Sequence, residues 1–481
     1  MIGTILDYLT EYGNKSLGEM RFTEVDAAIL CKLSYFNFDE FVSPPEAKMP
    51  SVSLKQIMLM EDHKKLINKG KYGDVHKQII ESMLAGKRFC ELRVAAVSNY
   101  MDKESQTQFA AVTFLLNSKL MFVVFRGTDS SIIGLREDFN LLYMDHAPCH
   151  EYAINYIKQI SEQYNRTMYL GGHSKGGHLA TYAAMFVPKN IQNRIHRIYS
   201  LDGLGLRPSV MKEGHYEDIE KKVFKLIPQS SLIGMMLQED DSYDVVHSTG
   251  VMLVQHNVNT WVVDGRKFVR DEKLNNNAIF VEHTFNGWLD SQDDENRRKF
   301  IDAMFYLVDI CEAEHLHELV ANGGHKFNQI IAGMKGLDEE TSKQVRMVLR
   351  AFVEVSRFYL KMDVGENIKE STAKSAQKIK ESTAKSKQKI KESTAKSTGK
   401  IKSATAGRTK SLIKSTVEET KKLTASTVEG TKRLTASTVK GTKKLVDSID
   451  VEKIKDSTKR KTKKIVKKSK KAIRRLAGGK V

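Results

Sequence analysis

The apolar positions along the chain change their spacing several times, and these changes predict alternating helices and strands. After Thr23, a residue suited to cap a helix, apolar residues recur at helical spacing at Ala27, Leu30 and Leu33. Apolar runs rich in valine and phenylalanine then predict strands in RVAAVSNYM, QFAAVTFLL and KLMFVVFRG, and shorter ones in IYSLDG and KVFKLIP. Strands that alternate with helical runs predict an α/β fold, with a mostly parallel sheet and helices on both faces.

The same pattern divides the chain into four parts. Residues 1–100 are mostly helical in character, and residues 101–293 carry the strands of the α/β core. Residues 294–362 return to a helical pattern with one amphipathic face, so we expect a helical extension packed on the core. Residues 366–481 are a basic tail built from an 11-residue repeat.

The most informative stretch is 168–186, MYLGGHSKGGHLATYAAMF. It contains G-x-S-x-G between a short strand and a helical run of small residues, which is the context of a nucleophile elbow. Glycines flank the serine because the turn is too sharp for side chains. We therefore predict Ser174 as a nucleophile, with the backbone N–H of Lys175 as one donor of an oxyanion hole.

A serine nucleophile needs a base, and in this arrangement the acid and then the histidine follow the serine, each on a loop after a strand. His256 follows the apolar run VMLVQ, which we interpret as a strand. On this order we prefer His256 to its rivals His247 and His283. His178 lies in the predicted elbow helix, where we expect it to be packed.

Two positions compete for the acid. Asp202 ends the strand IYSL, and the neighbouring glycines permit a tight turn toward the site. Asp240, Asp241 and Asp244 follow the next strand, where such folds more often carry the acid. We favour Asp202 because DDSYD is equally typical of an exposed acidic loop.

A second oxyanion donor is expected from the end of an earlier strand, and LMFVVFRGTD supplies that strand. Thr128 offers both its N–H and its hydroxyl there. The segment SSLIGMML, residues 230–237, is either a lid, an acyl-contacting segment or a buried helix.

FRGTD, GHSKGGHLA, SLDGLG and QHNVNTW together resemble the class 3 (fungal-type) lipases, in a bacterial branch of lipase-like α/β-hydrolases, over roughly residues 20–290. The resemblance implies an α/β-hydrolase fold, carboxylic ester hydrolysis, Ser174 and His256 as nucleophile and base, and Thr128 as the oxyanion residue. The chain departs from the family where the usual aspartate is expected. That segment reads IPQSSLIGMM, and neither Ser230 nor Ser231 can act as the anion.

Cysteine usage and hydropathy bear on the compartment. The four cysteines show no CxxC pair, so we expect free thiols in a reducing environment: Cys31, Cys90, Cys149 and Cys311. The chain starts without a signal-peptide pattern, and no apolar run approaches the roughly 18 residues that span a bilayer. These features predict a cytoplasmic protein, with any membrane contact peripheral on the inner face.

Two histidine clusters resemble metal sites superficially. The first contains Asp145, His146, Cys149 and His150, and the second His315, His317 and His325. Neither has a recognisable zinc spacing, and no phosphate-cradling glycine loop occurs, so no metal and no cofactor is expected.

The tail carries the excess positive charge. Residues 366–481 contain 35 basic and 11 acidic residues, whereas residues 1–365 contain 42 basic and 48 acidic ones. An apolar residue recurs every eleven positions from Ile368 to Leu445, which keeps one stripe on one side of a helix. We therefore expect an amphipathic helix on an anionic membrane or lipid-droplet surface. A solvated, disordered chain is the next alternative, and nucleic-acid binding is the least favoured of the three.

Two functions follow from these patterns. The first is a serine esterase, lipase or phospholipase-like, that hydrolyses lipid esters at a surface through Ser174, His256 and Asp202. The alternative is a catalytically silent lipase-like scaffold, whose tail coats a lipid surface or binds nucleic acid.

Overall fold

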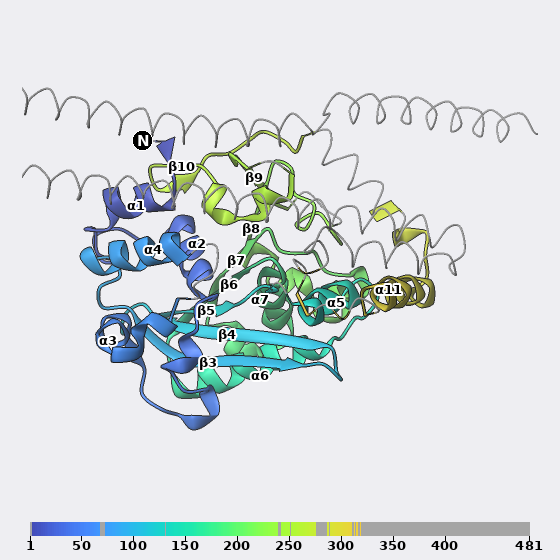
Figure 1. Cartoon of the computed structure of the whole chain (residues 1–481), viewed down its shortest axis with the longest axis horizontal. Helices are drawn as coiled ribbons and strands as arrows, with labels where there is room; N and C mark the ends of the chain where they lie inside the picture. The colour runs from blue at the N-terminus through green and yellow to red at the C-terminus, as the bar shows by residue number, and fades with distance from the viewer. Residues whose placement is uncertain are drawn as a thin grey trace, which may run out of the picture. The chain divides into compact units, whose positions relative to one another are not determined.

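The chain divides into two units, Met1–Ser371 and Thr372–Val481 (Figure 1). The computed structural model describes residues 2–67, 73–129, 131–238, 242–250, 252–275, 286–287, 289–309, 312, 314–315 and 318, all in the first unit. Several sequence-based predictions lie outside the described residues: the tail 366–481, the acid candidates Asp240 and Asp241, His283, Cys311, His317 and His325.

The centre of the first unit is an eight-stranded sheet in the order β2-β3-β4-β5-β6-β7-β8-β9. Its strands are β2 (Val52–Ser53), β3 (Arg93–Asp102), β4 (Thr107–Leu115), β5 (Leu120–Phe125), β6 (Thr167–His173), β7 (Ile195–Leu201), β8 (Val223–Pro228) and β9 (Asp244–Val246). Strands β5 to β9 are parallel, as predicted, and the fold is that of an α/β-hydrolase.

The edge from β2 to β5 is antiparallel, which the sequence analysis did not predict. For β3, β4 and β5 the cause is the length of the connections. Only residues 103–106 join β3 to β4, and only residues 116–119 join β4 to β5. Parallel neighbours need a crossover of a dozen or more residues, so these short links require hairpins.

The parallel strands bring three chain segments to one edge of the sheet. Phe125 at the end of β5 pairs with Gly172 in β6, and His173 at the end of β6 pairs with Leu201 at the end of β7. The residues that follow these three strands therefore leave the sheet side by side. These residues include Thr128, Ser174 and Asp202.

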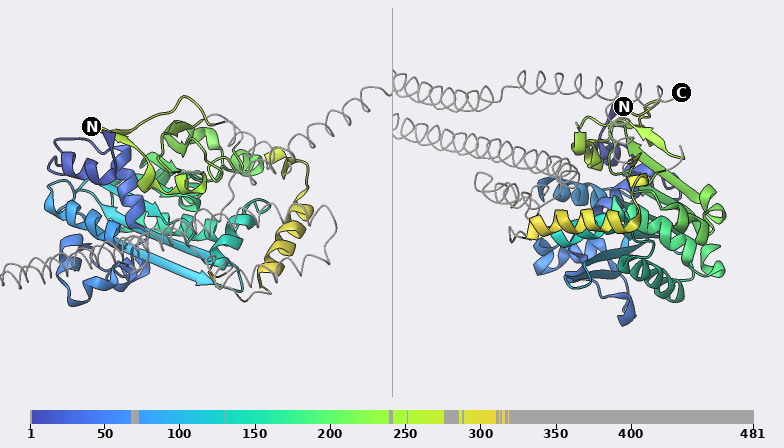
Figure 2. Two further views of the ribbon diagram at one scale, coloured as in Figure 1. Left: turned by 45° about the horizontal axis from the view of Figure 1, so that its top comes forward. Right: turned by 90° about the vertical axis from the view of Figure 1, so that its right-hand side faces the viewer.

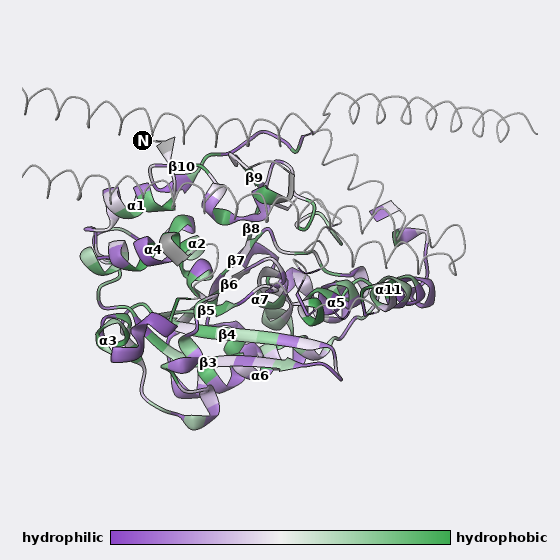
Figure 3. Ribbon diagram, viewed as in Figure 1, coloured by the Kyte–Doolittle hydropathy of each residue, from purple (hydrophilic) through white to green (hydrophobic). Residues whose placement is uncertain are grey.

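Helices cover both faces of the sheet, as predicted, and alternate strand residues point to each. One face carries α1 (Ile5–Tyr12), α2 (Glu24–Leu33), α3 (Leu54–Leu59) and α4 (Gly73–Ala85), and the other carries α6 (Pro148–Gln163) and α7 (Lys175–Phe186). Phe122 and Val124 of β5 pack in the first core, whereas Met121 and Val123 pack in the second. Figure 3 shows apolar colour along the central strands and a mixture of apolar and polar colour on the outer helices.

The start of α2 is stabilised by a reciprocal cap and by a buried ion pair. Helix α2 begins after Thr23, as predicted, whose hydroxyl accepts from the N–H of Asp26 while the Asp26 carboxylate accepts from the N–H of Thr23. That carboxylate also pairs with Arg88, and neither side chain is exposed. A 3-10 turn, η3 (Glu61–Lys65), precedes α4 in this mostly helical part.

Helices α5 (Ile132–Asn140) and α11 (Asp294–Asp309) lie against each other (Figures 1 and 2). The ring of Phe139 is 5.9 Å from that of Phe305, and Arg136 forms ion pairs with Asp302 and Asp309. Helix α11 begins at the residue where the sequence pattern turns helical again. No helix within the described ranges has the length and apolar character that crossing a bilayer requires.

The remaining elements are short. Helices α8 (Lys189–Gln192) and α9 (Pro208–Glu213) follow the elbow helix and β7, and the 3-10 turns η6 (Met252–His256) and η7 (Val258–Thr260) follow β9. A second small sheet joins β1 (Ile2–Gly3), β10 (Val263–Asp264) and β11 (Lys267–Phe268). It ties the N-terminus to the segment that comes after His256.

Candidate active site

The turn between β6 and α7 holds Ser174 in a strained conformation. Its φ of 59° and ψ of −132° lie outside the region that most side chains adopt. A Cβ at Gly172 would lie 2.2 Å from the carbonyl carbon of Gly176, and one at Gly176 would lie 2.0 Å from the oxygen of Phe125. Glycine is therefore required at both positions, which is the geometry of a nucleophile elbow.

Asp202 and His256 are in direct contact, although 54 positions separate them in sequence. The Nδ1 of His256 lies 2.6 Å from Oδ2 of Asp202. Asp202 is 1% exposed, whereas the His256 side chain is 22% exposed. An ionised carboxylate can only accept, so Nδ1 carries the proton and Nε2 presents a lone pair.

The other oxygen of Asp202 is fixed by the segment 230–237. Oδ1 accepts from the Ser231 hydroxyl and, at 3.2 Å, from the N–H of Gly234. Ser231, Met235 and Met236 are buried, and the segment forms turns. Residues 230–237 therefore form turns and not the helix that was one of the expectations, and Ser231 orients the carboxylate.

The rival residues that the structure describes have other partners. Asp244 begins β9 and forms an ion pair with Arg270, and His247 pairs with Asp271. His178 is buried within the elbow helix α7, as expected. Of the acid and base candidates in the described ranges, the structure brings Asp202 and His256 together.

The backbone before His256 differs from the prediction. The run VMLVQ was expected to be a strand, but Met252–His256 is a 3-10 turn, and the last strand of the sheet ends at Val246. The carbonyl of His256 accepts from Nε2 of His173 at 2.6 Å, and the two rings lie 4.3 Å apart. His173, the residue before the nucleophile, thus links the elbow to the histidine loop, a role that the sequence analysis missed.

His173 is held neutral by its surroundings. Its Nε2 must donate to a carbonyl, so its Nδ1 accepts from the Tyr35 hydroxyl at 3.1 Å. Burial, with a further contribution from the charge of His256, lowers the pKa of His173 well below its usual value. The structure does not place a Ser174–His256 hydrogen bond, and such bonds often tighten only when substrate binds.

Thr128 lies beside the elbow. A Cβ at the preceding Gly127 would come within 3.0 Å of the Ser174 Cβ, so the two loops are in contact. The Thr128 hydroxyl donates to Oδ1 of Asp138 in α5 at 2.6 Å. Burial raises the pKa of Asp138 to about 6, against the opposing effects of Lys175 and Thr128. Among the described residues, the backbone N–H groups of Thr128 and Lys175 have no hydrogen-bond partner.

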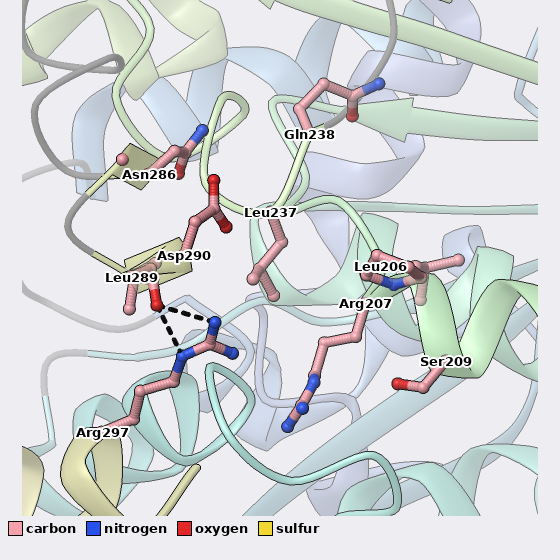
Figure 4. Close-up of a pocket in the computed structure, with 11 residues that line it drawn as sticks. Leu206, Arg207, Ser209, Leu237, Gln238, Asn286, Leu289, Asp290 and Arg297 are labelled. Atoms are coloured by element: carbon pink, nitrogen blue, oxygen red, sulfur yellow. Dashed lines mark hydrogen bonds between the residues drawn. The ribbon is translucent and has the colours of Figure 1, made fainter. Parts of the chain in front are cut away.

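A cavity of about 680 Å³ lies apart from this constellation (Figure 4). Its wall includes Leu206, Arg207, Leu237, Leu289 and Arg297, but none of Ser174, His256 and Asp202. Arg297 donates twice to the Leu289 carbonyl, and Arg207 pairs with Asp145 and Asp294. Both guanidinium groups therefore hold the wall together.

In the first histidine cluster, His150 belongs to a packed, hydrogen-bonded pair with His178 of α7. His150 Nδ1 accepts from the Ala147 N–H, His150 Nε2 donates to His178 Nε2 at 2.8 Å, and His178 Nδ1 donates to the Gly205 carbonyl. Every ring nitrogen is used, with both rings neutral. No metal-binding group of His, Cys, Asp and Glu side chains occurs among the residues that the structure describes.

This histidine pair predicts a loss of stability in acid. Burial lowers the pKa of His178 from 6.5 to about 4 and that of His150 well below 6.5. Between pH 6.5 and 4 the unfolded chain binds protons that the folded chain refuses, so stability falls by about 1.4 kcal/mol per pH unit for each such histidine. Urea unfolding at pH 7 and pH 5 should show a smaller difference for His178→Gln than for the wild type.

A matched variant at an exposed position controls for this effect. The His215 side chain is 72% exposed, so His215→Gln should keep the wild-type dependence on pH. Other groups that change stability with pH are the same in the wild type and in the variants, so their contributions cancel in the comparison. Asp138, whose contribution opposes that of the histidines, is one of them. An unchanged pH difference in His178→Gln would contradict the assignment.

The chain is similar to known proteins over part of its length. Residues 83–306 match the model of the Mbeg1-like family. Similar solved structures include the M37 lipase (16% identity, 38% of this chain and 69% of that chain, TM-score 0.25) and lipase II from Rhizopus niveus (15% identity, 48% and 91%, TM-score 0.27). A fungal lipase–inhibitor complex is also similar (11% identity, 41% and 81%, TM-score 0.25).

The comparison with curated proteins finds no match. At these identities the similar structures concern the fold alone. With its parallel strands β5 to β9, its strand–serine–helix elbow and helices on both faces, the chain has a lipase-like α/β-hydrolase fold.

Proposed function

We propose that this protein is a serine hydrolase of carboxylic esters, and that its substrates are lipid esters presented at a surface. The observation that carries the proposal is the hydrogen bond from His256 Nδ1 to the buried carboxylate of Asp202, on the loop next to the strained Ser174. A buried acid, an oriented imidazole and a serine at an elbow are the parts that acyl transfer needs.

The mechanism has two acyl-transfer steps. His256 Nε2 takes the proton of the Ser174 hydroxyl while Oγ bonds to the ester carbonyl carbon. The tetrahedral intermediate expels the alcohol, which takes the proton from His256. Water then gives a proton to His256 and attacks the acyl-enzyme, and the carboxylic acid leaves as the proton returns to Ser174. Asp202 stabilises the imidazolium in both steps.

The two unpaired backbone N–H groups, of Lys175 and Thr128, are the proposed oxyanion donors. The Thr128 hydroxyl gives its proton to Asp138, so its part is to hold the loop and its N–H in place. We expect Thr128→Val to lower kcat about 10- to 100-fold and to leave KM nearly unchanged. Steady-state hydrolysis of a soluble ester measures this, and an unchanged kcat would remove Thr128 from the site.

The proposal that the substrate lies at a lipid surface rests on the tail. The excess of basic residues in 366–481 suits anionic headgroups, and its eleven-residue apolar stripe suits an interface. The tail is therefore proposed to hold the hydrolase at an anionic membrane or lipid droplet. The sequence motifs FRGTD and GHSKGG support ester chemistry of the lipase type.

The full chain can be tested with p-nitrophenyl esters of short, medium and long acyl chains, with and without anionic phosphatidylserine vesicles. We expect turnover that increases on the vesicles and disappears after pretreatment with a fluorophosphonate. Zwitterionic vesicles of the same size are the control for the surface charge. A folded chain that hydrolyses none of these esters would instead support the catalytically silent scaffold.

A further inference from the structure

The side chain that follows the nucleophile is a fully buried lysine. Lys175 is the first residue of α7, and its side chain is 0% exposed. Its ammonium group has three protons, and all three are used. Nζ donates to the Gln108 carbonyl at 2.6 Å, to Gln108 Oε1 at 3.0 Å and to Oε2 of Glu137. The charge is thus completely satisfied inside the protein.

The partners of Lys175 come from two other elements. Gln108 lies in β4 and Glu137 in α5, and the Gln108 N–H also donates to Glu137 Oε2 at 3.2 Å. The Glu137 side chain is 1% exposed. Although burial alone acts to lower it, the charges of Glu137 and Asp138 raise the pKa of Lys175 above its usual value. The ion pair therefore joins the first turn of α7 to α5 and to the sheet.

Two consecutive acids of α5 hold the two residues that carry the unpaired N–H groups. Glu137 binds the side chain of Lys175, and Asp138 binds the hydroxyl of Thr128. A Cβ at Gly134, one turn earlier in α5, would lie 2.9 Å from Thr128 Cγ2 and 3.1 Å from Gln108 Oε1. The Thr128 and Lys175 anchors therefore occupy one packed region.

Stability alone does not explain a buried ion pair at this position. Removing two charges from water costs several kcal/mol per ion, and apolar residues of similar volume often serve as well or better. The pair is instead suited to fixing one geometry, because a satisfied ammonium permits a single arrangement of its partners. What the pair fixes is the position of the peptide unit that follows Ser174.

We propose that the Lys175–Glu137 ion pair is a positioning element that fixes the first turn of α7 against α5, so that the N–H groups of Lys175 and Thr128 converge on the same oxyanion. The inference rests on the proposed ester hydrolysis. Lys175 acts here through its backbone N–H, and the ammonium and Glu137 only hold that N–H in place.

The test compares one chemical change in two buried ion pairs. Glu137→Gln and Asp26→Asn each replace a buried carboxylate by its amide, the first beside the elbow and the second beside Arg88. Both variants should melt at lower temperature than the wild type. Only Glu137→Gln should lower kcat, at least tenfold and with KM nearly unchanged, when both are assayed well below their melting temperatures.

A second variant separates positioning from packing. The double variant Lys175→Met/Glu137→Leu removes both charges and keeps the volume, so its melting temperature should return toward the wild-type value. Its kcat should remain at least tenfold low. Wild-type kcat in the double variant would overturn this inference and leave the proposed function standing. A loss of kcat in Asp26→Asn equal to that in Glu137→Gln would do the same. A wild type without turnover would overturn the proposed function and this inference together.

Discussion

Ser174→Ala is expected to lower kcat for a p-nitrophenyl ester by about 10⁶-fold, to the level of the uncatalysed reaction plus whatever the oxyanion donors supply. The substitution removes the hydroxyl and keeps the Cβ, so the contact with the Gly127 loop persists and the fold should be retained. Hydrolysis and thermal unfolding of the same sample separate loss of chemistry from loss of structure.

Ser105→Ala is a suitable control for this substitution. The Ser105 hydroxyl donates to Asp102 and to Thr107 in the exposed hairpin between β3 and β4, and it forms no hydrogen bond with Ser174, Asp202 or His256. It should have wild-type activity. Ester hydrolysis that survives in Ser174→Ala would mean that another group performs the reaction.

Asp202→Asn is expected to lower kcat by about 10⁴-fold without unfolding the protein. The reason lies in what surrounds Oδ1. The Gly234 N–H can only donate, so the oxygen of the new amide must take the Oδ1 position and its NH₂ must face His256. An NH₂ at that place forces Nδ1 to accept. The imidazole then carries its proton on Nε2, where it cannot take one from Ser174.

The rival carboxylate provides the matched comparison. Asp244, the first residue of β9, forms a partly exposed ion pair with Arg270. Because such a surface pair contributes little, Asp244→Asn should leave kcat within about twofold of the wild type. Measuring kcat of the wild type, Asp202→Asn and Asp244→Asn on one soluble ester shows which carboxylate acts with His256. Equal losses in the two variants would show that Asp202 has no special role.

The elements that the sequence predicted well are those with local signals. The elbow at Ser174, the strand before Asp202 and the cap at Thr23 each depend on residues within a few positions of one another. The apolar run VMLVQ misled the prediction, because an apolar run of that length also fits a 3-10 turn.

The contacts that the sequence did not predict join distant segments. Ser231 meets Asp202, Glu137 meets Lys175 and His173 meets His256 across 29, 38 and 83 positions. Periodicity identifies elements but not which loops converge. The adjacent acids Glu137 and Asp138, in the segment IIGLREDFN, were the local signal available for these contacts.

The most direct test of the account is the reaction of the full chain with a fluorophosphonate at neutral pH, with the adduct located by mass spectrometry of its peptides. The hydroxyl that His256 and Asp202 activate should form a single adduct, on the peptide containing Ser174, and His256→Ala should slow its formation by at least about 10³-fold. An adduct on another residue, no adduct at all, or equal rates in the wild type and His256→Ala would contradict it.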